Sequence, residues 1–152
     1  MGRLLVHISA DGRQKVHRKL CRFQGGFLNS PPLLHTGANG YPLFNAMKVD
    51  SYFLEYDNAR AGTFAPLRNV PEGKFVVLGL VASKASELES VDMLKRRIEE
   101  ASRYVKLEQL GLSPQCGFAT SAAEHVTVTE EVERTKLARI VEVAQQVWGS
   151  AP

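Results

Sequence analysis

The sequence predicts an α/β fold built around a parallel sheet. From about residue 49 onward, short apolar segments alternate with longer segments of helical periodicity. One short segment, Phe75–Val81, contains no polar residue, which is typical of a strand that is covered on both faces. Strands that alternate with helices form βα units, and such units assemble into parallel sheets.

The composition is that of an ordinary globular protein and argues against several functional classes. The chain has 152 residues, 44% of them hydrophobic and 23% charged, with a formal net charge of +3. No basic run is long enough to follow a nucleic-acid backbone, so we expect no nucleic-acid partner. No segment approaches the roughly 20 apolar residues of a membrane span, and no signal peptide is recognisable. The two cysteines, Cys21 and Cys116, are far apart in a chain without export signals, which favours reduced thiols and a cytoplasmic protein.

Residues 1–48 predict an irregular amino-terminal segment that contains Cys21. A short strand is compatible with residues 4–8, but a charged stretch follows without a clear period. The helix breakers Gly25-Gly26 and Pro31-Pro32 come next. A loop of this length inside a compact domain is either functional or poorly ordered. We therefore place the ordered domain at residues 49–152.

Two strands and a helix are expected at the start of this domain. Aromatic and β-branched residues predict a strand over 49–56, and the apolar run predicts a buried strand over 75–81. A helix is predicted over 91–104, with Ser90 as its N-cap. Its apolar residues form one stripe, namely Val91, Leu94, Ile98, Ala101 and Val105.

The carboxyl-terminal part predicts one more strand and one more helix. Residues 107–112 are predicted to form another short strand. Thr127 and Glu130 have the spacing of a capping box, and they predict the start of a long helix that ends at Gly149. The residues expected to face the core are Val132, Leu137, Ile140, Val141, Ala144 and Val147. These units are too few to close an eight-stranded barrel, and open strand edges in an incomplete barrel predict self-association.

Two thiols and one carboxylate are candidates for a metal centre. Cys116 follows the last predicted strand. In parallel α/β folds, catalytic and binding residues commonly lie on the loops that leave the carboxyl ends of the strands. Glu55 ends an otherwise apolar strand, and a carboxylate there is paired, protonated or bound to a metal. Together with Cys21 they have the donor types that zinc accepts. No pair has CxxC spacing, so inert cysteines and a salt bridge between Glu55 and Arg60 stay open as alternatives. The histidines that could complete a zinc site are His7, His17, His35 and His125.

Several segments resemble the cobalamin-independent methionine synthase family in its shorter, single-barrel form. They are Tyr52-Phe-Leu-Glu-Tyr-Asp-Asn-Ala-Arg-Ala-Gly-Thr-Phe64 with Pro66-Leu67, Val77-Leu-Gly-Leu-Val-Ala-Ser-Lys84, Leu112-Ser-Pro-Gln-Cys-Gly-Phe118, and the stretch from Lys136 to Gly149. The resemblance runs from about Asn45 to Gly149 with the family's order and spacing. It implies a partial TIM (β/α)8 barrel, consisting of roughly the last three to four βα units.

The resemblance also implies a set of zinc ligands. The family binds zinc through a His-x-Cys pair, a glutamate, and a cysteine in a Pro-x-Cys-Gly loop, and these fall on Cys21, Glu55 and Cys116. The position of the family's histidine holds Lys19, an ammonium group that cannot bind zinc. His17 is the remaining candidate, although four extended residues would place it about 13 Å from Cys21.

The implied activity is zinc-dependent methyl transfer to a thiol. The family's donor is 5-methyltetrahydropteroyltriglutamate and its acceptor is homocysteine, which becomes methionine. The resemblance covers only the last part of the family's barrel, so we expect little turnover from this chain alone, and we assign no catalytic or substrate-binding residue. Two alternatives stay open: a non-catalytic barrel remnant of a disrupted gene, and a related zinc-dependent alkyl transferase that acts on another thiol, such as coenzyme M.

Overall fold

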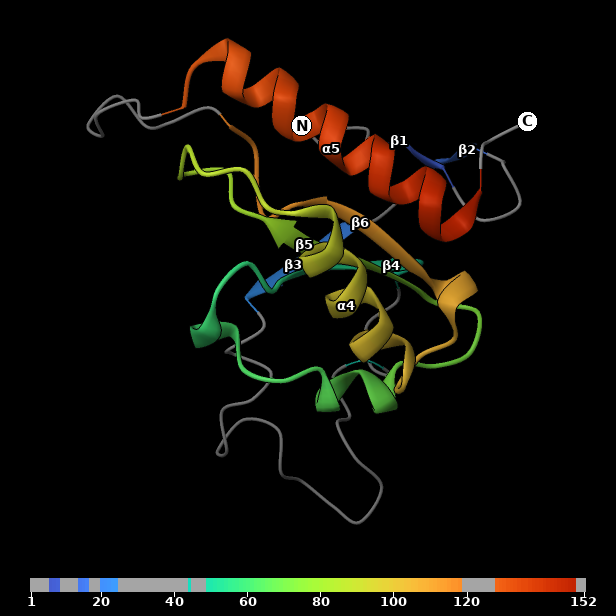
Figure 1. Ribbon diagram of the computed structural model, residues 1–152. Helices are drawn as coiled ribbons and strands as arrows, with labels where there is room; N and C mark the ends of the chain where they lie inside the picture. Colours follow the sequence, from blue (N-terminus) through green and yellow to red (C-terminus); the bar gives the residue numbers. More distant parts are fainter. Residues whose placement is uncertain are drawn as a thin grey trace.

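The protein is a mixed α/β structure with a four-stranded parallel sheet (Figure 1). The computed structural model describes residues 6–8, 14–16, 20–24, 44, 49–118 and 128–149, and for the first three of these ranges it describes the backbone only. The sheet has the order β3-β4-β5-β6, and a separate antiparallel pair is formed by β1 and β2. The strands are β1 (Val6–Ile8), β2 (Gln14–Val16), β3 (Leu20–Gln24), β4 (Ser51–Glu55), β5 (Phe75–Val81) and β6 (Leu110–Pro114).

The sheet confirms the predicted parallel arrangement. Each of the three neighbouring strand pairs is parallel. Strand β5 has the predicted bounds, and all seven of its residues are buried, as expected for a strand covered on both faces. Strand β3 lies within the segment that showed no clear period in the sequence, yet it pairs with β4 over five residues.

The prediction of a strand over residues 107–112 is wrong for the first three residues. Residues Leu107–Gln109 form a 3₁₀ turn, η3, and β6 then runs to Pro114. The side chain of Gln109 holds this turn, because its amide nitrogen donates to the carbonyl of Lys74 at 2.8 Å and to that of Pro71 at 3.2 Å. These partners are 35 and 38 residues away in the sequence, so local hydrophobicity could not reveal them.

Helix α4 (Val91–Ser102) confirms the prediction for this segment closely. The Ser90 hydroxyl accepts a hydrogen bond from the backbone N–H of Met93 at 3.2 Å, which satisfies a donor at the helix start. The predicted apolar stripe faces the core, where Leu94, Ile98 and Ala101 are buried.

Helix α5 (Glu130–Trp148) differs from its prediction at the start and along its buried face. Its N-cap is Thr129, whose hydroxyl accepts from the N–H of Val132 at 3.3 Å, whereas Thr127 lies outside the described residues. Leu137 and Val141, predicted to face the core, are 42% and 55% exposed. The fully buried positions are Lys136 and Val143 instead.

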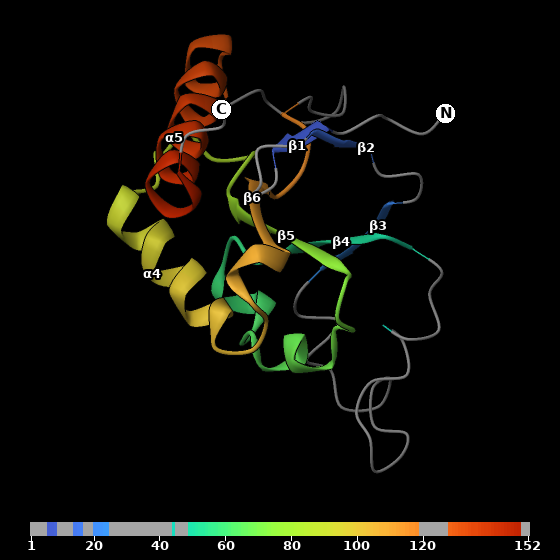
Figure 2. The ribbon, with the colours of Figure 1, turned by 90° about the vertical axis from the view of Figure 1, so that its right-hand side faces the viewer.

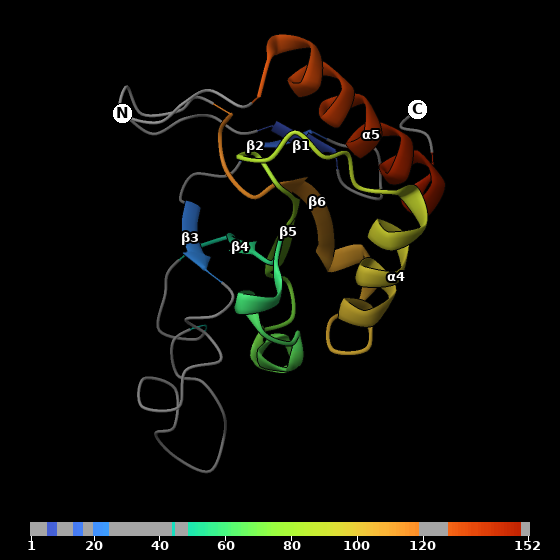
Figure 3. The same cartoon turned by 60° about the vertical axis from the view of Figure 1, so that its left-hand side comes forward.

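Both long helices lie on the same side of the sheet (Figures 2 and 3). The turns η1 (Ala59–Ala61) and η2 (Ala65–Asn69) carry the chain from β4 to β5. The core cluster joins residues of the sheet, the helices and this connection, including Tyr52, Phe64, Leu78, Ile98 and Val143. None of the described helices is long and apolar enough to cross a membrane.

Candidate functional site

The candidate site lies at the carboxyl edge of the parallel sheet. Glu55 is the last residue of β4 and stands in register with Gly79 of β5, which in turn pairs with Ser113 of β6. Cys116 follows two residues after the end of β6. The side chains of Glu55 and Cys116 are both half-buried, so neither is sealed in the core. The fold therefore brings two of the predicted zinc ligands to one edge, on strands separated by β5.

Gly79 allows the chain after β6 to fold closely over β5. A Cβ atom at this position would lie 2.9 Å from the Cα of Gln115, 3.2 Å from the carbonyl oxygen of Leu54 and 3.4 Å from that of Pro114. Contacts below 3.0 Å to backbone atoms force something to move. The absence of a side chain at Gly79 is thus what lets the loop with Cys116 approach the strand ends.

Two strand-end loops are hydrogen-bonded to each other beside Cys116. The backbone N–H of Gln115 donates to the carbonyl of Val81 at 2.7 Å, and the N–H of Ser83 donates to the Gln115 side-chain oxygen at 3.2 Å. The hydroxyl of Ser83 lies 2.7 Å from the sulfur of Cys116, where either atom can donate. Ser83 is fully buried. Cys116 is therefore fixed by partners on the neighbouring loop.

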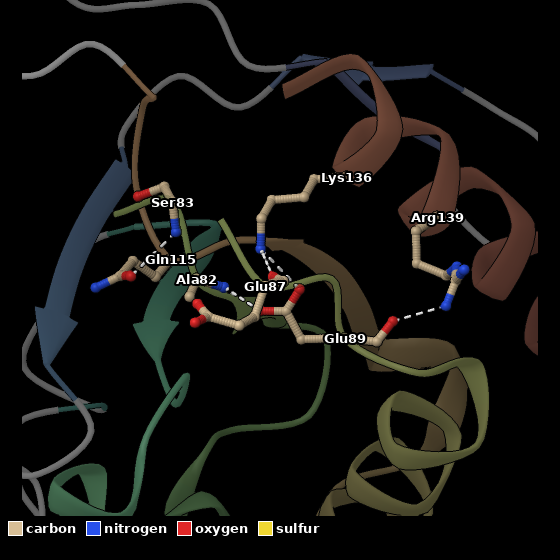
Figure 4. A network of polar contacts seen from close by, with 7 residues as sticks. All are labelled: Ala82, Ser83, Glu87, Glu89, Gln115, Lys136 and Arg139. Atoms are coloured by element: carbon tan, nitrogen blue, oxygen red, sulfur yellow. Dashed lines mark hydrogen bonds and ion pairs between the residues drawn. The ribbon is translucent and has the colours of Figure 1, made fainter. Parts of the chain in front are cut away.

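A buried ion pair holds the same loop from the side of α5 (Figure 4). The Nζ of Lys136 lies 3.0 Å from Oε2 of Glu89 and also donates to the carbonyl of Glu87. Oε1 of Glu89 accepts from the N–H of Ala82 at 2.7 Å, and the backbone carbonyl of Glu89 accepts from Arg139 at 2.7 Å. The lysine side chain has no exposed surface and that of Glu89 is 13% exposed. These contacts connect the helix with the loop that carries Ser83.

The register between β3 and β4 does not place Cys21 beside Glu55, and His17 is not described. Cys21 lies in β3 opposite Tyr52, whereas Gln24 is the residue opposite Glu55. Three residues of extended strand span about 10 Å. His17 and Lys19 lie outside the described residues. The distance predicted between His17 and Cys21 therefore stays a prediction.

The described part of the chain contains two of the predicted zinc donors at one end of the sheet, and no complete metal cluster. Within it, no group of three or more His, Cys, Asp or Glu residues could hold an ion. A cysteine and a glutamate at one end of the sheet nevertheless fit zinc chemistry, since zinc accepts sulfur and carboxylate oxygen donors in tetrahedral sites.

A separate cavity of about 210 Å³ lies between the β4–β5 connection and α4. Residues of the connection, including Asp57 and Asn58, line it together with Leu80, Met93 and Arg97. Arg97 is engaged there, since its guanidinium lies 4.2 Å from the centre of the Phe64 ring and bonds Glu100 at 3.1 Å. The cavity contains neither Glu55 nor Cys116.

Sequence reasoning missed Ser83, Glu89 and Lys136. The signal for Lys136 was available: it precedes Ile140, Val143 and Val147 by four, seven and eleven residues, the spacing of one helix face. A charged residue on that face interrupts the apolar stripe, so the prediction omitted Lys136 and Val143. It included the exposed Leu137 and Val141 together with Ile140 and Val147, which do pack against the core. No local pattern marked Ser83, because its partner Cys116 is 33 residues away.

Comparisons with known proteins agree with this architecture. Residues 33–146 match the model of the cobalamin-independent synthase catalytic domain. Two uncharacterized Bacillus subtilis proteins, YxjG and YxjH, are 55% and 48% identical to the chain over 107 residues, which are 70% of this chain and 28% of each relative. A crystal structure of a Listeria monocytogenes protein, provisionally named a vitamin-B12-independent methionine synthase, superimposes with a TM-score of 0.58 and 44% identity over 72% of this chain and 30% of that one. The chain thus spans less than a third of the length of these relatives. With the family model matching most of its residues, the chain belongs to the cobalamin-independent synthase catalytic-domain family.

Proposed function

We propose that this chain forms the last βα units of a partial TIM barrel and carries part of a zinc centre for methyl transfer to a thiol. The family is generally zinc-dependent, and a cobalamin-independent synthase transfers the methyl group without a corrinoid. The observation that carries the proposal is the placement of Glu55 and Cys116 at the same edge of the parallel sheet.

The proposed ligands are Glu55, Cys116 and Cys21, with His17 as the candidate for a further position. Glu55 ends β4 and Cys116 follows β6, on either side of Gly79 in the central strand β5. In the described register Cys21 lies three residues before the level of Glu55. Its participation would therefore require β3 to lie differently against β4 in the metal-bound protein.

Each residue has a defined part in the proposed chemistry. Bound zinc would lower the pKa of the substrate thiol, so that a thiolate is present at neutral pH. Glu55 and Cys116 would donate negative charge to the metal, which keeps that thiolate nucleophilic. The fixed loop at Ser83 and Gln115 would hold Cys116 in one orientation. Protonation of the donor's leaving nitrogen requires an acid, and we assign none in this chain.

The proposed substrates follow from family membership. Homocysteine is the proposed acceptor and a methyl-folate the proposed donor, as in a methionine synthase. A different thiol acceptor remains the enzymatic alternative. A barrel remnant without activity is the non-enzymatic one, and the short coverage of the relatives favours little turnover from this chain by itself.

Zinc stoichiometry tests the proposal directly. We expect purified, chelator-treated chain to take up about one zinc per chain, measured by elemental analysis after gel filtration. Cys116→Ser and Glu55→Gln should each abolish stoichiometric uptake, while Arg60→Gln, at an exposed position five residues after Glu55, should retain it. Folded wild-type chain that remains metal-free would contradict the proposal.

Two further measurements separate the alternatives. If Cys21→Ser keeps the zinc affinity of the wild type, Cys21 is not a ligand and the described register of β3 also holds with metal. Methyl transfer is then measured with homocysteine and with coenzyme M as acceptors, in each case with methyl-tetrahydrofolate triglutamate. Zinc binding without transfer to either thiol would support the remnant.

A further inference from the structure

We propose that Ser83 is a positioning residue for Cys116, and that the buried Lys136–Glu89 ion pair holds the loop that presents it. This inference rests on the proposed function for its chemical purpose. Its geometric content, the control of the Cys116 side chain by the Ser83 hydroxyl, can be tested without any metal.

The contact between the two side chains is close and shielded. The Oγ of Ser83 lies 2.7 Å from the Sγ of Cys116, and Ser83 has no exposed surface. A buried hydroxyl must find a hydrogen-bond partner, and here the partner is the sulfur. In the neutral thiol either atom can donate. A thiolate only accepts, so the Ser83 hydroxyl would donate to the sulfur whenever Cys116 is ionised or bound to a metal.

The backbone of Ser83 is fixed from two directions. Its N–H donates to the Gln115 side chain at 3.2 Å, which ties it to the loop of Cys116 itself. On the other side, the N–H of Ala82 donates to Glu89 at 2.7 Å, and Glu89 is paired with Lys136 of α5. The hydroxyl therefore projects from a loop segment that cannot shift without breaking buried polar contacts (Figure 4).

This arrangement matters for a ligand on a loop. Cys116 lies beyond the last hydrogen-bonded residue of β6, so the sheet does not by itself fix its side chain. Hydrogen bonds from neighbouring groups orient metal ligands and tune the charge that they donate. Ser83 supplies this contact to Cys116, and α5 supplies the rigid support through Lys136.

The metal-free test uses the Cys21→Ser background with ¹³Cβ-labelled cysteine. In the parent chain we expect one Cys116 signal with the couplings of a single χ1 rotamer. Ser83→Ala should give rotamer-averaged couplings, while Ser83→Thr, which keeps the hydroxyl, should restore the single rotamer. Ser86→Ala, an exposed serine in the same loop, serves as the matched control and should leave the signal unchanged. An unaltered rotamer in Ser83→Ala, or averaging that Ser83→Thr does not restore, would overturn the inference.

The metal-bound test uses Cd²⁺, whose sulfur-to-metal charge-transfer band reports on Cys116. Ser83→Ala should weaken Cd²⁺ binding by about 10- to 100-fold and shift the band, while Ser83→Thr should recover both. If neither the wild-type chain nor the Cys21→Ser chain shows such a band, the zinc proposal fails and the rotamer measurement alone decides the role of Ser83. Should Ser83→Ala not fold, Cys116→Ala tests the contact from the other side: it must shift the Ser83 ¹³Cβ resonance and leave that of Ser86 in place, and an unmoved Ser83 resonance would refute the contact.

Discussion

Gly79 shows how a single missing side chain shapes the candidate site. We expect Gly79→Ala to destabilise the protein by about 1–3 kcal/mol, because the added carbon would lie 2.9 Å from the Gln115 backbone. The same displacement should move the loop of Cys116 and weaken zinc uptake. Urea unfolding and zinc analysis measure the two effects. Gly73→Ala is the control, since a Cβ at Gly73 meets nothing within 4 Å and its positive φ of 80° would give only backbone strain. Normal zinc uptake by Gly79→Ala would show that the loop can move away from β5 without any loss of zinc binding.

Lys136 is the second residue whose environment makes a definite prediction. Replacing Lys136 by Met leaves Glu89 without its buried partner, so we expect a loss of about 3–5 kcal/mol in the free energy of unfolding. The double variant Lys136→Met with Glu89→Gln should recover part of this loss, since the uncompensated carboxylate is then gone. Chemical denaturation of the three proteins measures the difference. Equal stability of the single variant and the wild type would mean that the ion pair positions the loop but adds nothing to the free energy of unfolding.

Helix α5 presents one buried and one exposed apolar face, and the two faces predict opposite results. Val143 is fully buried, so Val143→Ala should cost about 2 kcal/mol or more through lost contacts and the cavity left behind. Val141 is 55% exposed, so Val141→Ala should change stability by less than about 0.5 kcal/mol. The pair is matched in chemistry and lies on one helix. A substantial loss from Val141→Ala would indicate that this face is covered in solution.

The contrast between α4 and α5 explains where helix prediction succeeded. In α4 the polar residues avoid the buried face, and the stripe of Leu94, Ile98 and Ala101 was predicted correctly. In α5 the buried face includes Lys136, whose charge is compensated by Glu89 from a distant loop. A periodicity argument assigns charged residues to solvent. It therefore left Lys136 out of the buried face and included the exposed Leu137 and Val141, although Ile140 and Val147 were predicted correctly and pack against the core.

At the scale of the whole molecule, the described sheet has β3 and β6 at its edges. Among the described strands, each of these two pairs on one side only. Such edges offer unpaired backbone groups to other chains, so we expect concentration-dependent self-association of the isolated chain. Sedimentation velocity over a hundredfold range of concentration measures it. A monomer throughout that range would indicate that other parts of the chain cover these edges.

The sequence by itself determined the class of the fold and predicted that the candidate site lies at the strand ends. The uninterrupted apolar run of β5 and the alternation of strands with helices required a parallel sheet, because only a strand covered on both faces excludes polar residues throughout. The strand-end positions of Glu55 and Cys116 followed from the same pattern. The family could also be recognised from its segments, and the match over residues 33–146 confirms it.

Only the tertiary structure decided which groups surround Cys116 and which face of α5 is buried. Ser83 meets Cys116 across 33 residues, Lys136 meets Glu89 across 47, and Gln109 meets Lys74 across 35. Each contact satisfies a polar group that burial removes from water, and its partner is chosen by the packing of elements far apart in the chain. Local periodicity carries no information about such partners, so they became visible only when the loops and helices were placed together.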